Sequence, residues 1–241
     1  MARLPELMMN LGLALAVGFL SWHRYWFLAV VLVLIVELWP VRSRLNLDGL
    51  LERTPLIAMG ASIAVIISIV PKALTQLAIV FFYVAWRFWM EREPERRHDL
   101  INTVVILTAT FQAIFLASAI WHLPNLLTLV LTWMAIYGLS YQALRVRGEV
   151  SAQLMAAVWA LVGTEATWLF LTWQVSYILP NSYLIVPQAV VVLTALGYCF
   201  GGILMSQRRG ELSRSRLAEY VVIGATLIAI VIAGTPWRGT V

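Results

Sequence analysis

Charged residues are scarce in this 241-residue chain: Asp, Glu, Lys and Arg make up 12% of it, whereas hydrophobic residues make up 61%. A soluble domain carries roughly a quarter of charged residues, because its surface must be solvated. A larger core would not remove the need for that surface. The composition therefore excludes an ordinary soluble domain and predicts that much of the apolar surface faces lipid.

The chain also has little that could hold a metal or a cofactor. Its one cysteine, Cys199, excludes an internal disulfide and lies in a hydrophobic run, where a small packing role is expected. The three histidines, His23, His98 and His122, are far apart in the sequence. Protein metal sites need clusters of such residues. The sequence therefore predicts no metal and no cofactor.

Several catalytic motifs are missing. There is no His-Glu-x-x-His, no P-loop, and no Gly-x-Ser-x-Gly with a histidine inside a span, which argues against a metalloprotease, an ATPase and a rhomboid-like protease. The only lysine, Lys72, lies at a segment boundary, which argues against a retinal Schiff base. The net charge of +5 comes from basic residues in short loops, so it predicts membrane orientation rather than nucleic-acid binding. An enzyme is thus less expected than a non-enzyme, but the question stays open.

What the chain does contain is a series of apolar segments of about the length of a membrane span, ~17–25 residues. Barrel strands would alternate over about ten residues, whereas these segments are apolar all round, so they are predicted to be helices. We expect an all-α polytopic transmembrane helical bundle, one domain over 1–241, with about nine spans. A reading with eight stays open, because only His23-Arg24 separates the first two segments. The segments are 7–22, 25–41, 55–71, 73–90, 100–121, 126–144, 151–179, 184–205 and 217–236.

The basic residues predict the orientation of these spans. With nine spans and a cytoplasmic N-terminus, all basic residues except Arg24, Lys72 and Arg238 fall on the cytoplasmic side. Such a bias is expected in membrane proteins. The sequence Ser21-Trp22-His23-Arg24 is a poor cleavage site, so the first segment is expected to be a membrane helix rather than a signal peptide. The predicted location is the plasma (inner) membrane, multi-pass.

Two cytoplasmic loops share a pattern that suggests repeated two-helix units within 73–236. Arg147-Gly148-Glu149-Val150-Ser151 and Arg209-Gly210-Glu211-Leu212-Ser213 lie 62 residues apart, each before an apolar segment. Such a duplication would fit the internal symmetry common in transporters. The alternative is convergence on one loop chemistry: arginine for orientation, glycine for the turn, and an acid near a helix N-terminus.

Glu165 is the most informative polar residue. It lies at the middle of segment 151–179, where a charge costs about 2.5–3.5 kcal/mol and normally faces the bundle interior or a cavity. Thr172 and Ser176 follow on the same predicted helix face. One hypothesis is a polar path in which Glu165 binds a proton or cation. The other is structural, with Glu165 bonded to a neighbouring helix, for example through Gln112 or a threonine near it.

Other intramembrane polar and small residues are expected to be structural. Glu37 lies near Arg42 and could pair with it or reach the interface. Segment 100–121 is polar for its place, so it should face protein rather than lipid. Gly197 and Gly201 form a Gly-x-x-x-Gly pair that would let another helix approach closely.

The C-terminal third resembles a family of small polytopic bacterial membrane proteins that has no established activity. The resemblance is carried by Glu165, the run to Leu179-Pro180-Asn181, the basic loop ending in Glu211-Leu212-Ser213, Glu219-Tyr220 and Thr235-Pro236-Trp237. It implies a membrane protein and implies no mechanism.

Three functions stay open from the sequence. The first is a small transporter- or channel-like bundle that uses Glu165. The second is a non-catalytic accessory or scaffold subunit of a membrane complex. The third is a membrane enzyme acting on lipid, for which the loop carrying Glu95, His98 and Asp99 offers the best material. The predicted partners are the lipid bilayer, other membrane subunits or a second copy, and no nucleic acid.

Overall fold

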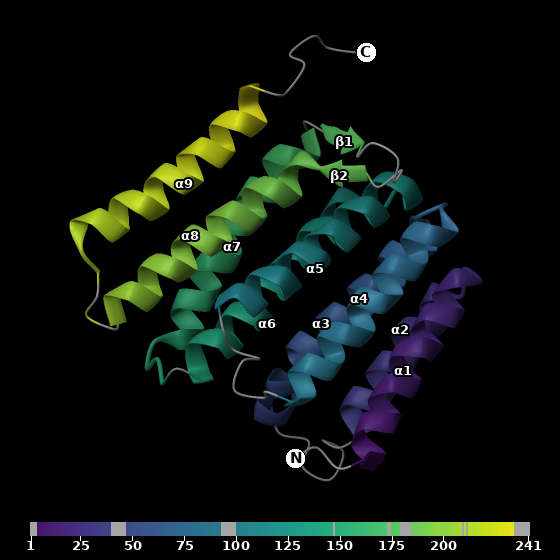
Figure 1. Ribbon diagram of the computed structural model, residues 1–241. Helices are drawn as coiled ribbons and strands as arrows, with labels where there is room; N and C mark the ends of the chain where they lie inside the picture. The colour runs from purple at the N-terminus through teal and green to yellow at the C-terminus, as the bar shows by residue number, and fades with distance from the viewer. Residues whose placement is uncertain are drawn as a thin grey trace.

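The computed structural model is all-helical apart from one short hairpin, and it describes residues 4–39, 47–92, 100–146, 148–172, 175–178, 185–208, 210 and 212–233. The helices run antiparallel, side by side, from α1 and α2 at one edge to α9 at the other (Figure 1). The elements are α1 Leu4–Trp22, α2 Trp26–Leu38, α3 Leu47–Ile69, α4 Ala73–Arg92, α5 Leu100–Trp121, α6 Asn125–Val146, α7 Ala152–Thr172, β1 Ser176–Ile178, β2 Ile185–Pro187, α8 Gln188–Arg208 and α9 Arg214–Ala233.

Five of the described helices, α4 to α8, are long and apolar enough to cross a membrane. The apolar stretches of α1, α2 and α3 are shorter. Because α2 has 13 residues, it is about 20 Å long and falls short of the ~30 Å of a hydrocarbon core. The all-helical prediction is confirmed, while the number of membrane crossings stays a prediction.

The first two segments are separate helices joined by a tight turn. Arg24 has a positive φ of 64°, and the Tyr25 N–H donates to the Leu20 carbonyl at 2.8 Å. His122 turns the chain in the same way between α5 and α6, with φ 52°. His23-Arg24 is therefore enough to reverse the chain, because one residue in the left-handed region closes the turn.

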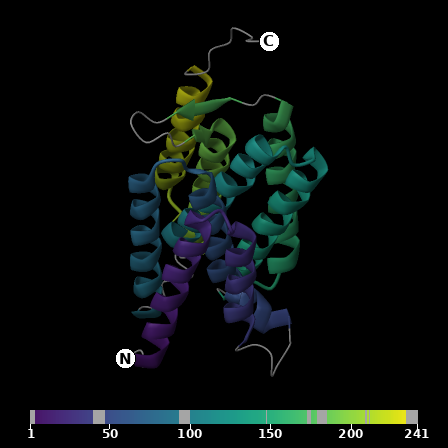
Figure 2. The ribbon, with the colours of Figure 1, turned by 90° about the vertical axis from the view of Figure 1, so that its right-hand side faces the viewer.

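The seventh segment is shorter than predicted. α7 ends at Thr172, and Ser176 lies in β1, which pairs antiparallel with β2 from Ser176↔Pro187 to Ile178↔Ile185. Pro180 disfavours helical conformations in the residue before it, and the aromatic Tyr177 followed by the β-branched Ile178 favours a strand. The expectation of helix up to 179 was wrong, and the hairpin lies at the end of the bundle where α8 begins (Figure 2).

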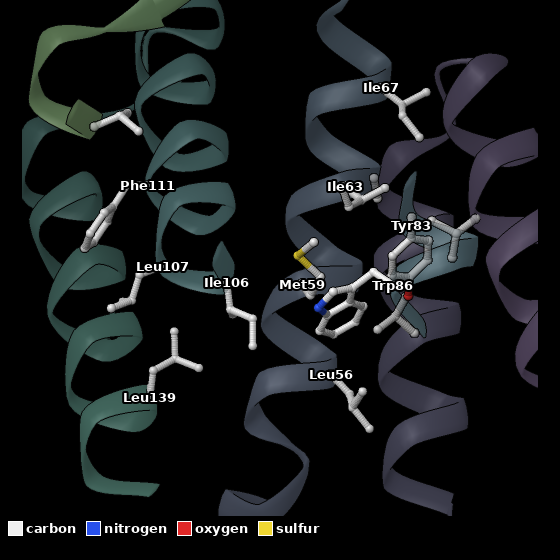
Figure 3. Packing of buried hydrophobic residues seen from close by; sticks show 14 of the residues in the cluster. Leu56, Met59, Ile63, Ile67, Tyr83, Trp86, Ile106, Leu107, Phe111 and Leu139 are labelled. Carbon is white, nitrogen blue, oxygen red and sulfur yellow. The ribbon is translucent and has the colours of Figure 1, made fainter. Parts of the chain in front are cut away.

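The core lies between α3, α4 and α5. Figure 3 shows Met59 and Ile63 of α3 beside Tyr83 and Trp86 of α4, with the apolar side chains of α5 on the other side of α3. Helix α5 packs on α3, α6 and α8, and it is the most buried of the five long helices. The prediction that segment 100–121 faces protein is therefore confirmed.

Candidate functional site

Two oppositely charged side chains meet inside the bundle formed by the first four helices. Glu37 is the penultimate residue of α2, and Arg87 lies five residues before the end of α4. The Arg87 guanidinium donates from Nη2 to Glu37 Oε1 in an ion pair. Glu37 is 1% exposed and Arg87 is 2% exposed, so both charges are removed from the surroundings of the protein.

Side chains of α1, of α3 and of the preceding turn of α4 supply polar partners for this pair. Asn10 of α1 accepts from Arg87 Nε at 3.0 Å and from Nη2 at 2.6 Å. The Tyr83 hydroxyl, one turn earlier on α4, accepts from Nη1 at 3.4 Å. Arg53 of α3 lies on the other side of Glu37, with Nη1 3.4 Å from Oε2. We call these five residues, Asn10, Glu37, Arg53, Tyr83 and Arg87, the charged cluster.

The charged cluster joins all four N-terminal helices and carries one more positive than negative charge. A buried ion costs several kcal/mol unless its partners satisfy it, and here the guanidinium and the carboxylate are both bonded. The side chain of Arg53 is 31% exposed, so the surplus positive charge lies on the side of the cluster that is open to the outside. The arrangement can lock four helices together and present a weak positive potential.

The charged cluster was only partly visible in the sequence. Glu37 was predicted either to pair with Arg42, which lies outside the described residues, or to reach the interface, and Arg87 was counted with the basic residues of the cytoplasmic side. The structure corrects this: Arg87 is within α4 and is the buried partner of Glu37. The available signal was an acid inside one apolar segment and a base inside another, a combination that membranes tolerate chiefly as a pair.

Cross-helix hydrogen bonds between neutral groups continue through the rest of the bundle. The Trp86 indole donates to Asn102 Oδ1 at 2.8 Å, linking α4 to α5. The hydroxyls of Thr108 and Thr194 lie 3.1 Å apart and link α5 to α8. Such bonds hold helices together where lipid offers no competing donor.

Glu165 does not lie in this network. It is exposed on α7, seven residues before the helix ends at Thr172, so it lies in the C-terminal half of the helix. No hydrogen bond joins its carboxylate to another described residue. Thr172 is also exposed, and its hydroxyl donates to the Leu169 carbonyl on its own helix at 2.6 Å.

The other two predicted site residues are elsewhere. Ser176 is on β1, so the helical face expected to join it to Glu165 does not extend that far. Gln112 is buried on α5 and donates through its amide to the Ile185 carbonyl of β2. The structure therefore keeps Glu165 and Thr172 on one face and separates Gln112 and Ser176 from it.

The exposed face of α7 forms a continuous stripe. We call Leu154, Val158, Leu161, Glu165, Trp168 and Thr172 the α7 stripe. The four apolar members are between 52% and 67% exposed. Glu165 is thus the one ionisable member of the α7 stripe. Apolar side chains lie on the helical turn before it and on the turn after it.

The glycines of α8 and α9 bring those two helices into close contact. A Cβ on Gly202 would lie within 3.0 Å of the Tyr220 ring, and one on Gly224 would lie 2.9 Å from Cys199 Sγ. The predicted pair behaves differently: a Cβ on Gly197 would lie 3.7 Å from Leu107 of α5, and Gly201 lines a small crevice among α5, α6, α7 and α8. Helix α8 does approach another helix closely through a glycine. That glycine is Gly202, which contacts α9, rather than the predicted pair Gly197 and Gly201.

The two repeated loops share their turn geometry. Gly148 and Gly210 both have positive φ, 75° and 66°, and each donates its N–H to the carbonyl three residues earlier. A residue with a Cβ would be strained at either position. This agreement fits a duplication and fits convergence equally well, so the repeat stays a prediction.

No group of three or more His, Cys, Asp or Glu in the described part of the chain could hold a metal ion. The loop with Glu95, His98 and Asp99 lies outside the described residues. No protein-family model, no curated protein and no solved structure matches this chain. The resemblance of its C-terminal third to bacterial membrane proteins therefore stays an expectation from the sequence.

Proposed function

We propose that this chain is a multi-pass protein of the plasma (inner) membrane with nine spans and a cytoplasmic N-terminus. The proposal is supported by the five long apolar helices and by the many large apolar side chains on the outer surface, such as Leu74, Phe81 and Leu126, each more than 70% exposed. It is also supported by the described arginines at one end of the antiparallel bundle, which are Arg53, Arg87, Arg92, Arg145, Arg208, Arg214 and Arg216.

Within that membrane, the function that the geometry supports best is a non-catalytic subunit that binds a partner helix through the α7 stripe. One observation carries this: Glu165 faces outward from α7 with no described partner. At about 1.5 Å per residue it lies ~10 Å from the outer end of the helix, inside the hydrocarbon layer of a spanning α7. A carboxylate there is costly in contact with lipid, so a partner that donates a hydrogen bond or a positive charge would stabilise it.

The structure supports the transport hypothesis less than the partner-binding function. It required a polar path through Glu165, Thr172 and Ser176, and Ser176 is on a strand outside the helical face. Three crevices among the described residues are lined mainly by apolar side chains, and Glu165 lines none of these three. The partner-binding function needs no such path.

Site-specific photo-crosslinking in native membranes tests the proposal. A photoreactive residue at Val158, on the α7 stripe, should give one discrete protein adduct, whereas the same residue at Leu15, equally exposed on α1, should not. Glu165→Leu should abolish the adduct, because a hydrogen-bonding partner is lost, and Glu165→Gln should retain it. Adducts of the same kind from both positions, or an adduct unaffected by Glu165→Leu, would rule out this interface. An adduct of twice the mass of the chain would identify the partner as a second copy.

A further inference from the structure

A groove between α1 and α4 lies directly beside the charged cluster. It has a volume of about 310 Å³, and Met8 and Leu11 of α1 form one wall. Phe81 and Phe88 form bulky ends on α4, and the small Ala85 lies between them, one turn from each. Asn10 and Arg87, from the charged cluster, also line the groove. It is open to the outer surface, since Met8 is 67% and Phe81 76% exposed.

The groove has a direction that matches a lipid of the cytoplasmic leaflet. From Phe88 to Phe81 it follows α4 for about 10 Å, at ~1.5 Å per residue, toward the middle of the helix. In the proposed orientation the end at Phe88 is the cytoplasmic one. An acyl chain laid from Phe88 toward Phe81 would therefore have its headgroup near the end of α4.

Among the described side chains, the charge at that end favours an anion. The guanidinium of Arg92, exposed on the last turn of α4, lies 4.4 Å over the ring of Phe88. Behind the groove, Arg53 and Arg87 outnumber Glu37 within the charged cluster. Arg87 is held by Asn10 and Glu37, so its charge contributes to the field, while Arg92 can reach a phosphate directly.

We propose that the α1–α4 groove is a saturable site for one anionic phospholipid of the cytoplasmic leaflet. Its acyl chain lies between Met8, Leu11, Phe81 and Phe88 over Ala85. Its phosphodiester is bound by Arg92 and attracted by the surplus positive charge of the cluster. This site is on the opposite side of the bundle from the α7 stripe and is independent of the partner proposed there (Figure 1).

Lipid titration of the purified full-length protein in detergent tests the proposal, with bound lipid counted by native mass spectrometry. Phosphatidylglycerol and phosphatidylcholine of identical chains are compared. Wild type should bind one phosphatidylglycerol about fivefold or more tightly than phosphatidylcholine, the discrimination expected of one nearby arginine. Equal affinities for the two lipids would overturn the anionic preference and with it the proposal.

Two variants with matched controls locate the site. Ala85→Trp fills the groove and should abolish stoichiometric binding of either lipid, whereas Ala225→Trp, at an exposed alanine of α9, should not. Arg92→Gln should remove the preference for phosphatidylglycerol and keep the weaker binding of phosphatidylcholine, whereas Arg214→Gln on α9 should change neither. Helical content by circular dichroism confirms that each variant is folded. Unchanged lipid binding in Ala85→Trp would overturn the proposal. It would also be overturned if the wild type is a dimer and Ala85→Trp separates the two copies without loss of bound lipid, because a second copy would then occupy the groove.

Discussion

Arg87 of α4 and Glu37 of α2, 50 residues apart in the sequence, form an ion pair in which both side chains are almost completely buried. Asn10 holds the guanidinium from α1, and Arg53 approaches the carboxylate from α3. The two residues differ in the number of oppositely charged partners. Glu37 has two, Arg53 and Arg87, whereas Glu37 is the one acidic partner of Arg87 among the described residues. This asymmetry makes the pair testable.

We expect Glu37→Leu to destabilise the protein more than Arg87→Leu does. Removing Glu37 leaves a buried guanidinium without a counter-charge, at a cost of about 3–5 kcal/mol. Removing Arg87 leaves Glu37 with Arg53, so the loss should be smaller. The double variant should lose less than the sum of the two, since neither charge remains stranded. Thermal unfolding in one detergent, followed by circular dichroism, measures all four proteins. Additive losses, or a larger loss for Arg87→Leu, would contradict this account.

Close packing of α8 on α9 predicts a measurable effect of one methyl group. Gly202→Ala would place a Cβ within 3.0 Å of the rigid Tyr220 ring, so α9 must shift, at a cost of about 1–3 kcal/mol. Cys199 lies under α9, with its thiol 3.2 Å from the Tyr220 carbonyl. The single cysteine should therefore react several times faster with a maleimide in Gly202→Ala. Gly12→Ala, where no atom lies within 4 Å, is the control and should react like wild type.

The orientation can be checked with single cysteines in a Cys199→Ala background. Lys72 and Val150 are both exposed and lie at opposite ends of the bundle, between α3 and α4 and between α6 and α7. A membrane-impermeant maleimide applied to intact cells should label Lys72→Cys, whereas Val150→Cys should be labelled after permeabilisation. The reverse pattern would place the N-terminus outside.

Much of the fold follows from local sequence. Segment 100–121 matches α5 at both ends, because an apolar stretch of membrane length has to form helix. Charged residues precede it, and His122 and Pro124 follow it. The end of α7 was missed, because the residues after Thr172 are as apolar as those before it and the hairpin depends on pairing with Ile185–Pro187, a strand that follows later in the chain. Hydrophobicity alone does not distinguish the end of the helix α7 from the strand β1 that follows it.

The sites were less predictable than the helices. Glu165 was singled out by its cost in a membrane, yet which way it faces depends on how α7 packs against α6. Arg87 was counted with the basic residues of the cytoplasmic side, although it lies inside segment 73–90. Its pairing with Glu37 requires α1, α2, α3 and α4 to meet, a fact that no single segment contains.

The spacing of the charged cluster along the chain also constrains how the protein is made. Glu37 emerges from the ribosome 16 residues before Arg53 and 50 residues before Arg87. At about 5–20 residues per second, Arg53 is synthesised roughly 1–3 s after Glu37, and Arg87 about 3–10 s after Glu37. Until Arg87 is synthesised, the Glu37 carboxylate of α2 lacks its buried partner. The insertion machinery must therefore shelter α2, or leave its end at the water interface, until α4 arrives to complete the pair.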